Sequence, residues 1–259
     1  MITLTSDFGL KDPYVAEMKG VILTINPKAT LIDITHEIEK FNIRMAAFML
    51  ASATKYFPQG TIHLAVVDPG VGTQRRAILI QTKKSFFVGP DNGILILAAQ
   101  SQGIEHIYEL TNPKLMLPQV SSTFHGRDIF APATAYLDKG AQPSEFGPEI
   151  NDPINPEFTL IKRTNSSLIG EVMHIDDFGN IITNINATDI SQNTAKIINV
   201  ELPNISLKLN FGKTYAQAKP KEPIALIGSH GFLEIALNQG NAAEKFHAKA
   251  GDKIVVTAA

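Results

Sequence analysis

Strand-like and helix-like patterns alternate along the first half of the chain, and this alternation is the feature that most limits its possible folds. Apolar runs at Ile2–Thr5, Thr30–Ile34 and Ile62–Val67 are typical of buried strands. Between them, residues 12–25 and 41–57 predict helices; in the second, apolar residues recur at 43, 46, 47, 50, 53 and 57, the spacing of one helix face. Strands that alternate with helices form a mostly parallel sheet covered by helices. The sequence therefore predicts an α/β sandwich.

Two aspartates are candidate N-caps for helices in this half of the chain. Asp12 precedes Pro13, a residue that suits a first helical turn, and Asp128 precedes another stretch that we expect to be helical. An aspartate at either position could accept hydrogen bonds from the free N–H groups of the first turn. Further strands are expected at 77–80 and 85–88, and a further helix at 93–99.

The pattern changes after about Gly147, where three prolines and two asparagines between 148 and 156 indicate a linker. Short segments bounded by turn residues follow, without long helices, as in small barrels and sandwiches. We expect strands at Ser167–Ile175, Asn180–Asn184, Ala195–Leu202, Ile205–Leu209, Pro223–Ile227, Phe232–Ala236 and Lys253–Thr257. The chain should therefore have an N-terminal α/β domain at 1–150 and a smaller C-terminal β-barrel-like domain at 160–259, and clefts between domains are common ligand sites.

Composition and charge exclude several classes of partner. A net charge of −2 at pH 7 gives no general attraction to nucleic acid or to an anionic membrane. The chain has no cysteine, which excludes disulfides and thiolate metal sites and fits a reducing compartment. Its first residues do not look like a signal peptide, and no apolar run reaches the roughly 18 residues of a membrane span. We expect a cytoplasmic protein that binds neither nucleic acid nor membrane.

Residues 68–76 are the clearest candidate for chemistry. Asp68 ends an apolar run on a tight Pro-Gly and Val-Gly turn, seven residues before Arg75. In α/β enzymes, loops of this kind present reactive groups at the open edge of the sheet. The loop lacks the Gly-Lys-Ser/Thr ending of a P-loop, so nucleoside triphosphates are not indicated. A structural turn that carries a surface ion pair explains the same residues equally well.

Two other motifs in the first half place polar groups beside glycine. Asp7, just after the first strand, could accept hydrogen bonds from a vicinal diol, or it could cap a local turn. The run 123–128 combines His125, Arg127 and Asp128 around a glycine, which suits the floor of a polar pocket. A histidine held only by backbone contacts is the plainer alternative.

A metal site is an alternative that the sequence favours weakly. Asp33, His36 and Glu37 lie together, but adjacent residues point to opposite faces of a strand and diverge by about 100° on a helix. The His-Glu-x-x-His motif of zinc hydrolases is absent. A metal-dependent hydrolase that uses His36, Glu37, His125 and Asp128 stays open as an alternative.

Two motifs of the second half are either turns or parts of a binding site. In 176–180, Asp, Gly and Asn are ordinary turn formers. The same segment could bind a nucleobase, because Phe178 can stack on a flat ring and the amide of Asn180 can read an adenine edge. The run 228–231 is either a turn or a carboxylate site made of Ser229 and backbone amides.

Taken in order, these motifs resemble one known family over nearly the whole chain. The matching segments are Thr5–Gly9, Asp33–His36, Val67–Gly72, Pro90–Gly93, Thr123–Asp128, Asp177–Asn180, Thr183–Ile185, Gly228–Gly231 and Ala236–Gly240. The chain resembles the adenosine-forming S-adenosyl-L-methionine (SAM) hydrolases, also called SAM hydroxide adenosyltransferases, which are related to fluorinase and chlorinase. The resemblance implies hydrolysis of SAM to adenosine and L-methionine by water or hydroxide at the ribose C5′. It implies no metal or cofactor, and a homotrimer with active sites at subunit interfaces.

The resemblance also implies roles for individual residues. The catalytic triad would be Asp68, Arg75 and His125, which would position the attacking water. Asp7 would hold the ribose hydroxyls, Phe178 and Asn180 would contact adenine, and Asp176 and Ser229 would contact the methionine amine and carboxylate. The remaining substrate-binding positions would be Phe8, Phe41 and Tyr215, the last two as apolar walls.

Departures from the halide-using relatives favour water as the nucleophile. Those enzymes carry a tyrosine in place of Asp68, a serine in place of Gly126, and a long insertion between Arg76 and Pro90 that this chain lacks. In fluorinases an arginine follows the serine of the methionine-carboxylate site, whereas His230 follows Ser229 here. A chlorinase-like adenosyl transferase and a SAM- or adenosine-binding module without turnover are the alternatives.

Overall fold

The computed structural model describes residues 1–190 and 196–258. The chain divides into two compact units, Met1–Pro156 (unit 1) and Glu157–Ala259 (unit 2). Each unit has its own sheet and its own hydrophobic core, and each is considered by itself.

Unit 1 contains a six-stranded, mostly parallel sheet with the strand order β2-β1-β3-β5-β4-β6. Four neighbours, β2, β1, β3 and β5, run parallel, whereas β4 is antiparallel to both β5 and β6. The strands are β1 (Ile2–Ser6), β2 (Leu31–Thr35), β3 (Ile62–Val66), β4 (Ala77–Thr82), β5 (Phe86–Pro90) and β6 (Ile104–Glu109). The predicted α/β sandwich is confirmed. Strand β6 was not expected, because its polar residues leave it half exposed at the sheet edge.

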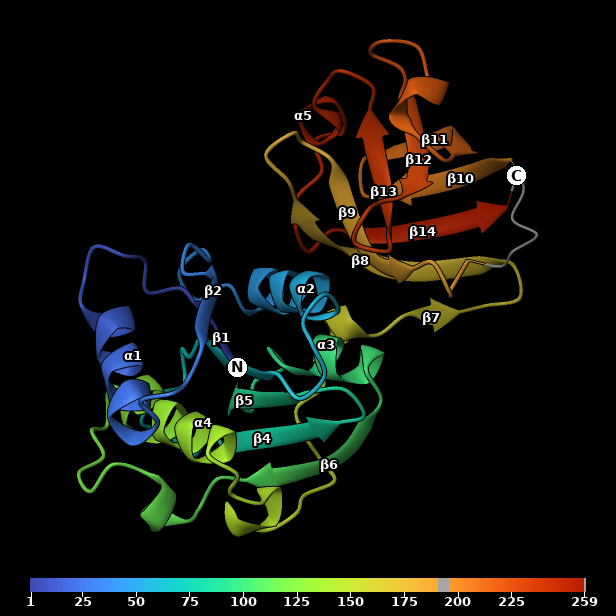
Figure 1. Ribbon diagram of the computed structural model, residues 1–259. Coiled ribbons are helices and arrows are strands. Elements are labelled where there is room, and N and C mark those ends of the chain that lie inside the picture. Colours follow the sequence, from blue (N-terminus) through green and yellow to red (C-terminus); the bar gives the residue numbers. More distant parts are fainter. Residues whose placement is uncertain (191–195, 259) are drawn as a thin grey trace. The chain divides into compact units, whose positions relative to one another are not determined.

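Helices cover both faces of this sheet: α1 and α4 pack together on one face, and α2 and α3 pack together on the other (Figure 1). Their bounds are α1 (Tyr14–Ile25), α2 (Ile43–Thr54), α3 (Ile96–Ser101) and α4 (Ala131–Asp138). Both expected N-caps are wrong. Pro13 occupies the N-cap of α1, without a side-chain cap bond. Asp128 lies inside a π-helical turn, Gly126–Phe130, that leads into α4, and its carboxylate is bound to other partners.

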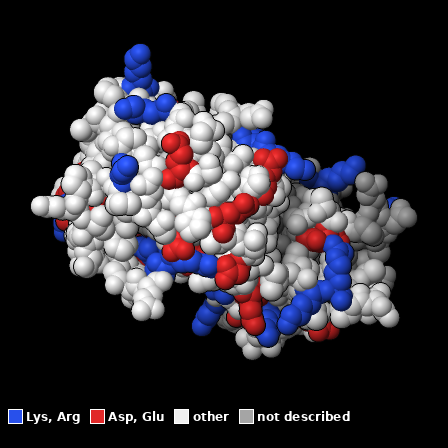
Figure 2. All heavy atoms as spheres, turned by 90° about the horizontal axis from the view of Figure 1, so that it is seen from below, with Lys and Arg blue, Asp and Glu red and all other residues white. Residues whose placement is uncertain are grey.

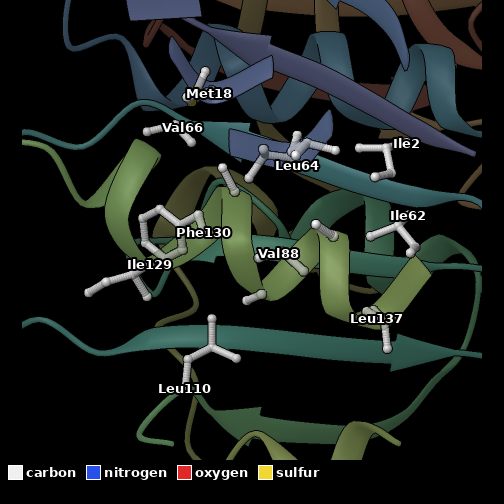
Figure 3. Close-up of a cluster of buried hydrophobic side chains, with 14 of the residues drawn as sticks. Ile2, Met18, Ile62, Leu64, Val66, Val88, Leu110, Ile129, Phe130 and Leu137 are labelled. Carbon is white, nitrogen blue, oxygen red and sulfur yellow. The ribbon is translucent and has the colours of Figure 1, made fainter. Parts of the chain in front are cut away.

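The core of unit 1 forms where α1 and α4 meet the sheet (Figure 3). Alternate residues of the central strands point to this side, among them Ile2, Ile62 and Leu64, because side chains alternate between the faces of a strand. Met18 from α1 and Phe130 before α4 complete the cluster, both at most 1% exposed. The loops that leave the carboxyl ends of β1 and β3 are therefore held by a rigid core.

Unit 2 is a barrel, which confirms the expected β-barrel-like domain. Its strands follow the order β14-β10-β11-β12-β13-β9-β8, and β14 also pairs with β8, so seven strands close within the described residues, with β7 attached to β8. The strands are β7 (Lys162–Arg163), β8 (Ser167–Ile175), β9 (Ile181–Asn186), β10 (Ile197–Leu202), β11 (Ile205–Gly212), β12 (Pro223–Ile227), β13 (Phe232–Leu237) and β14 (Lys253–Ala258). A short helix, α5 (Ala242–Phe246), packs against β13. The expected start of β10 at Ala195 lies outside the described residues.

On the face shown in Figure 2, basic and acidic side chains lie side by side, so this face carries no broad basic surface of the kind that binds nucleic acid. Within the described residues, no helix combines the length and the apolar character that a membrane crossing requires.

Candidate functional site

Asp68, Arg75 and His125 meet at one end of the sheet in unit 1. Asp68 follows β3, and the loop after it turns back so that Nε of Arg75 donates hydrogen bonds to both carboxylate oxygens, at 2.9 and 3.1 Å. The Nη2 atom of Arg75 also contacts Asp68 and lies 2.8 Å from Nδ1 of His125. The three side chains therefore form one continuous hydrogen-bonded cluster, the Asp68 cluster.

Glycines allow the loop after Asp68 to close. A Cβ at position 70 would lie 3.2 Å from Cγ of Arg75. Gly72 has φ +75° and lies so close to the segment before His125 that a Cβ there would be 2.3 Å from the carbonyl oxygen of Ser122. Such a contact excludes any side chain. The Val-Gly turn thus brings the Arg75 side of the cluster against the His125 side.

Two buried contacts fix the cluster from behind. The Arg75 guanidinium lies over the ring of Phe130, 5.2 Å from its centroid, and only 10% of the Arg75 side chain is exposed. Asp128, whose role as a helix cap was wrong, accepts hydrogen bonds from the backbone N–H of Ser121 at 2.8 Å and from Nε of Arg127 at 2.7 Å. These bonds hold the segment that presents His125, and π-helical turns such as 126–130 are frequent at functional sites.

His125 is neutral near pH 7. Burial lowers the pKa of its imidazole, the Arg75 guanidinium lowers the pKa further, and the Asp68 and Asp128 carboxylates act in the opposite direction. An arginine can only donate, so Nδ1 of His125 must accept the bond from Arg75. The neutral ring therefore carries its proton on Nε2.

The Asp68 cluster opens onto a pocket of about 350 Å³ in unit 1. Asp68 and His125 line the pocket, together with the predicted substrate-binding residues Asp7, Phe8 and Phe41, whereas Arg75 does not. Oδ2 of Asp7 accepts a hydrogen bond from the backbone N–H of Phe41 at 2.9 Å, and no described residue donates to Oδ1. Phe41 has a φ of +65°, an unusual value for an aromatic residue, and the residue is 69% exposed.

The other predicted site residues lie around a second pocket, of about 600 Å³, in unit 2. They are Asp176, Phe178, Asn180, Tyr215 and Ser229. Oδ1 of Asp176 accepts hydrogen bonds from the N–H groups of Phe178 and Asn180 at 3.0 and 2.9 Å, and Oδ2 accepts one from Nδ2 of Asn180 at 2.9 Å. Asp176 thus shapes its own turn and orients the Asn180 amide. Phe178, at the tip of this turn, is 78% exposed.

The residues of the metal alternative do not form one site. Nδ1 of His36 is bonded to Ser6 at 2.7 Å, and its Nε2 lies 3.1 Å from Asp33, which also pairs with Lys19. Ser6 is fully buried and His36 is 4% exposed, so these hydrogen bonds hold the end of β1 against the segment after β2. Among the residues that the structure describes, no group of three His, Asp or Glu side chains could hold a metal ion.

Two family models match the chain. Residues 2–147 match the N-terminal domain of the SAM hydroxide adenosyltransferases, and residues 170–255 match the C-terminal domain. The chain belongs to the SAM hydroxide adenosyltransferase family.

Named relatives in the family cover the chain almost end to end. An (R)-S-adenosyl-L-methionine hydrolase of Methanocaldococcus jannaschii is 38% identical, over 99% of this chain and 95% of its own. A fluorinase of Actinoplanes sp. is more distant, at 27% identity over 100% of this chain and 98% of its own. The crystal structure of an uncharacterized conserved protein from Thermotoga maritima has a TM-score of 0.88 and 40% identity, covering 99% of this chain and all of that chain.

The sequence did not predict that Glu234 is part of the second pocket. Glu234 lies in β13, where all six residues are buried, and its carboxylate lines the pocket and accepts a 2.7 Å hydrogen bond from the hydroxyl of Tyr215. A single carboxylate in the apolar run Phe-Leu-Glu-Ile-Ala-Leu was the available signal, because an ionisable side chain is rarely buried without a partner or a role.

Proposed function

We propose that the protein hydrolyses (R)-S-adenosyl-L-methionine to adenosine and L-methionine. The Asp68 cluster carries the proposal, since it joins a carboxylate and an imidazole at a pocket in a chain whose full-length relatives are named as hydrolases of this compound. The prefix (R) refers to the sulfonium sulfur, a stereocentre with three different carbon substituents. In the reaction, water oxygen forms a bond to the ribose C5′, the C5′–S bond breaks, and its electron pair stays on sulfur.

The sulfonium leaves as a neutral thioether and needs no acid, so the difficult component is the water. Water has a pKa of about 15.7, whereas an ordinary aspartate has one of about 3.9, so Asp68 cannot deprotonate water before attack. Asp68 instead orients the water and accepts its proton late, as the new C–O bond forms. Arg75 does not line the pocket and acts as a positioning residue. The step requires no metal or cofactor.

The tautomer of His125 supports a donor role for this residue. With Nδ1 bound to Arg75, the Nε2–H group can donate to the oxygen of the water. The water then receives one hydrogen bond from His125 and donates one to Asp68, which leaves a lone pair for C5′. Holding the water in line with the C–S bond, at about 3–3.5 Å from carbon, contributes several kcal/mol by proximity.

The substrate would use residues from both pockets. Oδ1 of Asp7 is open for a ribose hydroxyl, and Phe8 and Phe41 would wall the sugar. Phe178 would stack on adenine with Asn180 at its edge, Tyr215 would form an apolar wall, and Asp176 and Ser229 would meet the methionine part. We further propose a cytoplasmic homotrimer in which unit 1 of one copy and unit 2 of the next form each active site.

Incubation with each sulfonium epimer of SAM tests the proposal. Chromatography should show equimolar adenosine and methionine, formed faster from the (R) epimer, with activity that survives exhaustive chelation. Chloride should yield no 5′-chloro-5′-deoxyadenosine. Binding of SAM without products would instead support a sensing module, and sedimentation of the active protein at the mass of a monomer would contradict the trimer.

The pH dependence of turnover checks the donor role of His125. Protonation of the ring would place a proton on Nδ1 and break the bond to Arg75. Because the pKa of His125 is lowered, kcat/KM should be constant near neutrality and should fall on acidification only below the ordinary histidine value of about 6.5. A His125→Gln variant should lose this part of the profile. An acid limb with its midpoint at or above pH 7 would contradict the neutral donor.

A further inference from the structure

Glu234 is a buried carboxylate in the second pocket, and it has no role in the proposed mechanism. It is 4% exposed, it is the only ionisable residue of β13, and its side chain lines the pocket beside Asp176 and Tyr215. Burying a carboxylate is costly unless its charge is used or compensated. We therefore look for a group that compensates the charge of this carboxylate.

The contacts of Glu234 leave half of its carboxylate open. Oε1 accepts the 2.7 Å hydrogen bond from the Tyr215 hydroxyl, and no described residue donates to Oε2. Room for Oε2 exists because residue 228 is glycine: a Cβ there would lie 2.4 Å from this oxygen. Tyr215 and Gly228 thus hold the carboxylate in place with one oxygen unused.

Asp176 lies close enough to Glu234 for the two charges to interact. Burial raises the pKa of Glu234, the Tyr215 hydrogen bond lowers it, and the negative charge of Asp176 raises it further. The described residues that line the pocket include no lysine or arginine. His230 also lines the pocket, but neither Asp176 nor Glu234 is paired with a lysine or an arginine among these described residues, and two carboxylates in one pocket favour a ligand that brings a positive charge.

A count of hydrogen bonds identifies the group that fits. A carboxylate has about four acceptor sites, and Asp176 gives three of them to its own turn. A primary ammonium has three N–H donors. Asp176 alone cannot satisfy them, whereas Asp176 and the open side of Glu234 together can.

We propose that Glu234 is a substrate-binding residue that holds, together with Asp176, the ammonium group of the methionine part of SAM. This assignment rests on the proposed function. The pocket thereby selects for the amino acid end of the substrate by charge as well as by shape.

A cross of two proteins with two ligands tests the contact. The proteins carry Asp68→Asn, to slow turnover, with Glu234 either kept or changed to glutamine. The ligands are SAM and its analogue with hydrogen in place of the amino group. Glutamine keeps an oxygen that can accept from Tyr215 and removes the charge. Calorimetry should show SAM bound about 10–100-fold more weakly by E234Q, as for a lost hydrogen bond to a charged group, and the analogue bound within about twofold.

Equal losses for both ligands would overturn the proposal, because Glu234 would then act on adenine, on the sulfonium or through Tyr215. Tyr215→Phe tests the effect through Tyr215, since it removes the hydroxyl and keeps both carboxylates. If Y215F shows the same selective loss of SAM affinity as E234Q, the ammonium contact is also refuted. Glu222→Gln, an exposed glutamate outside the pocket, is the matched control and should bind both ligands like the parent.

A second route reaches the same carboxylate if E234Q does not fold. Gly228→Ala places a methyl group against Oε2, and residue 228 has no positive φ, so alanine fits the backbone. It should also weaken SAM selectively. Hydrolysis of SAM by the unmodified protein is measured separately. If the protein hydrolyses SAM but E234Q weakens both ligands equally, only the Glu234 contact is refuted. If E234Q weakens SAM alone but the unmodified protein does not hydrolyse SAM, only the proposed reaction is refuted.

Discussion

Asp68→Asn is expected to lower kcat by about 10²–10⁴-fold, the range that a positioned proton acceptor contributes. The amide has nearly the same shape but cannot accept the water proton, and its NH₂ group would face the N–H groups of Arg75 if it took the place of the acceptor oxygen. The dissociation constant of SAM should stay within about threefold, because only interactions made in the transition state are lost. Discontinuous assays of adenosine formation measure kcat, and calorimetric titration with SAM measures the dissociation constant.

The neighbouring arginine supplies the control for this variant. Arg76 pairs with Asp152 at 2.7 Å, through a carboxylate that is 82% exposed and outside the pocket. Asp152→Asn removes an aspartate–arginine pair from the same loop, and such surface pairs contribute only about 0.2–1 kcal/mol. Turnover of D152N should therefore match the unmodified protein. Unchanged turnover in D68N, or equal losses in both variants, would remove Asp68 from the reaction.

The sheet and the barrel strands were predictable because they rest on local patterns. The runs that became β1 and β3 are apolar enough to be buried from both sides, and their loops carry the glycines that the sequence singled out. The barrel strands likewise follow from short apolar segments between turns. Closure of the barrel was not readable in detail, because β8 and β14 pair although most of unit 2 separates them along the chain.

The site was predictable only in part, for reasons that lie in tertiary contacts. The motifs named Asp68, Arg75 and His125, but their meeting depends on the approach of Gly72 to Ser122 across a long stretch of chain. Asp128 was assigned to a helix cap because aspartate commonly caps helices, yet Arg127 and the Ser121 backbone compete for it. Glu234 was predicted only as part of the apolar strand 232–236, because a strand pattern does not show which buried position faces a pocket.

A buried histidine away from both pockets should make the stability of unit 1 strongly dependent on pH. His63 in β3 is fully buried between the rings of Phe57 and Phe87, with Nδ1 bonded to Thr3 at 2.7 Å and Nε2 without a partner. Burial lowers the pKa of His63 to about 3, with a smaller contribution from the charge of Lys84. The imidazole is therefore neutral in the folded protein.

Acidification should destabilise the fold through this residue, because the unfolded chain binds a proton at about pH 6.5 and the folded chain does not until about pH 3. The free energy of unfolding should fall by about 2 kcal/mol between neutrality and pH 5, and by about 5 kcal/mol in all, if no other group intervenes. Urea titrations from pH 7 to 5 measure this slope. His63→Leu should flatten it by that amount, whereas His106→Gln, at a half-exposed histidine paired with Glu149, should retain it because His63 is unchanged. A slope in H63L equal to that of the unmodified protein would mean that other groups govern acid unfolding.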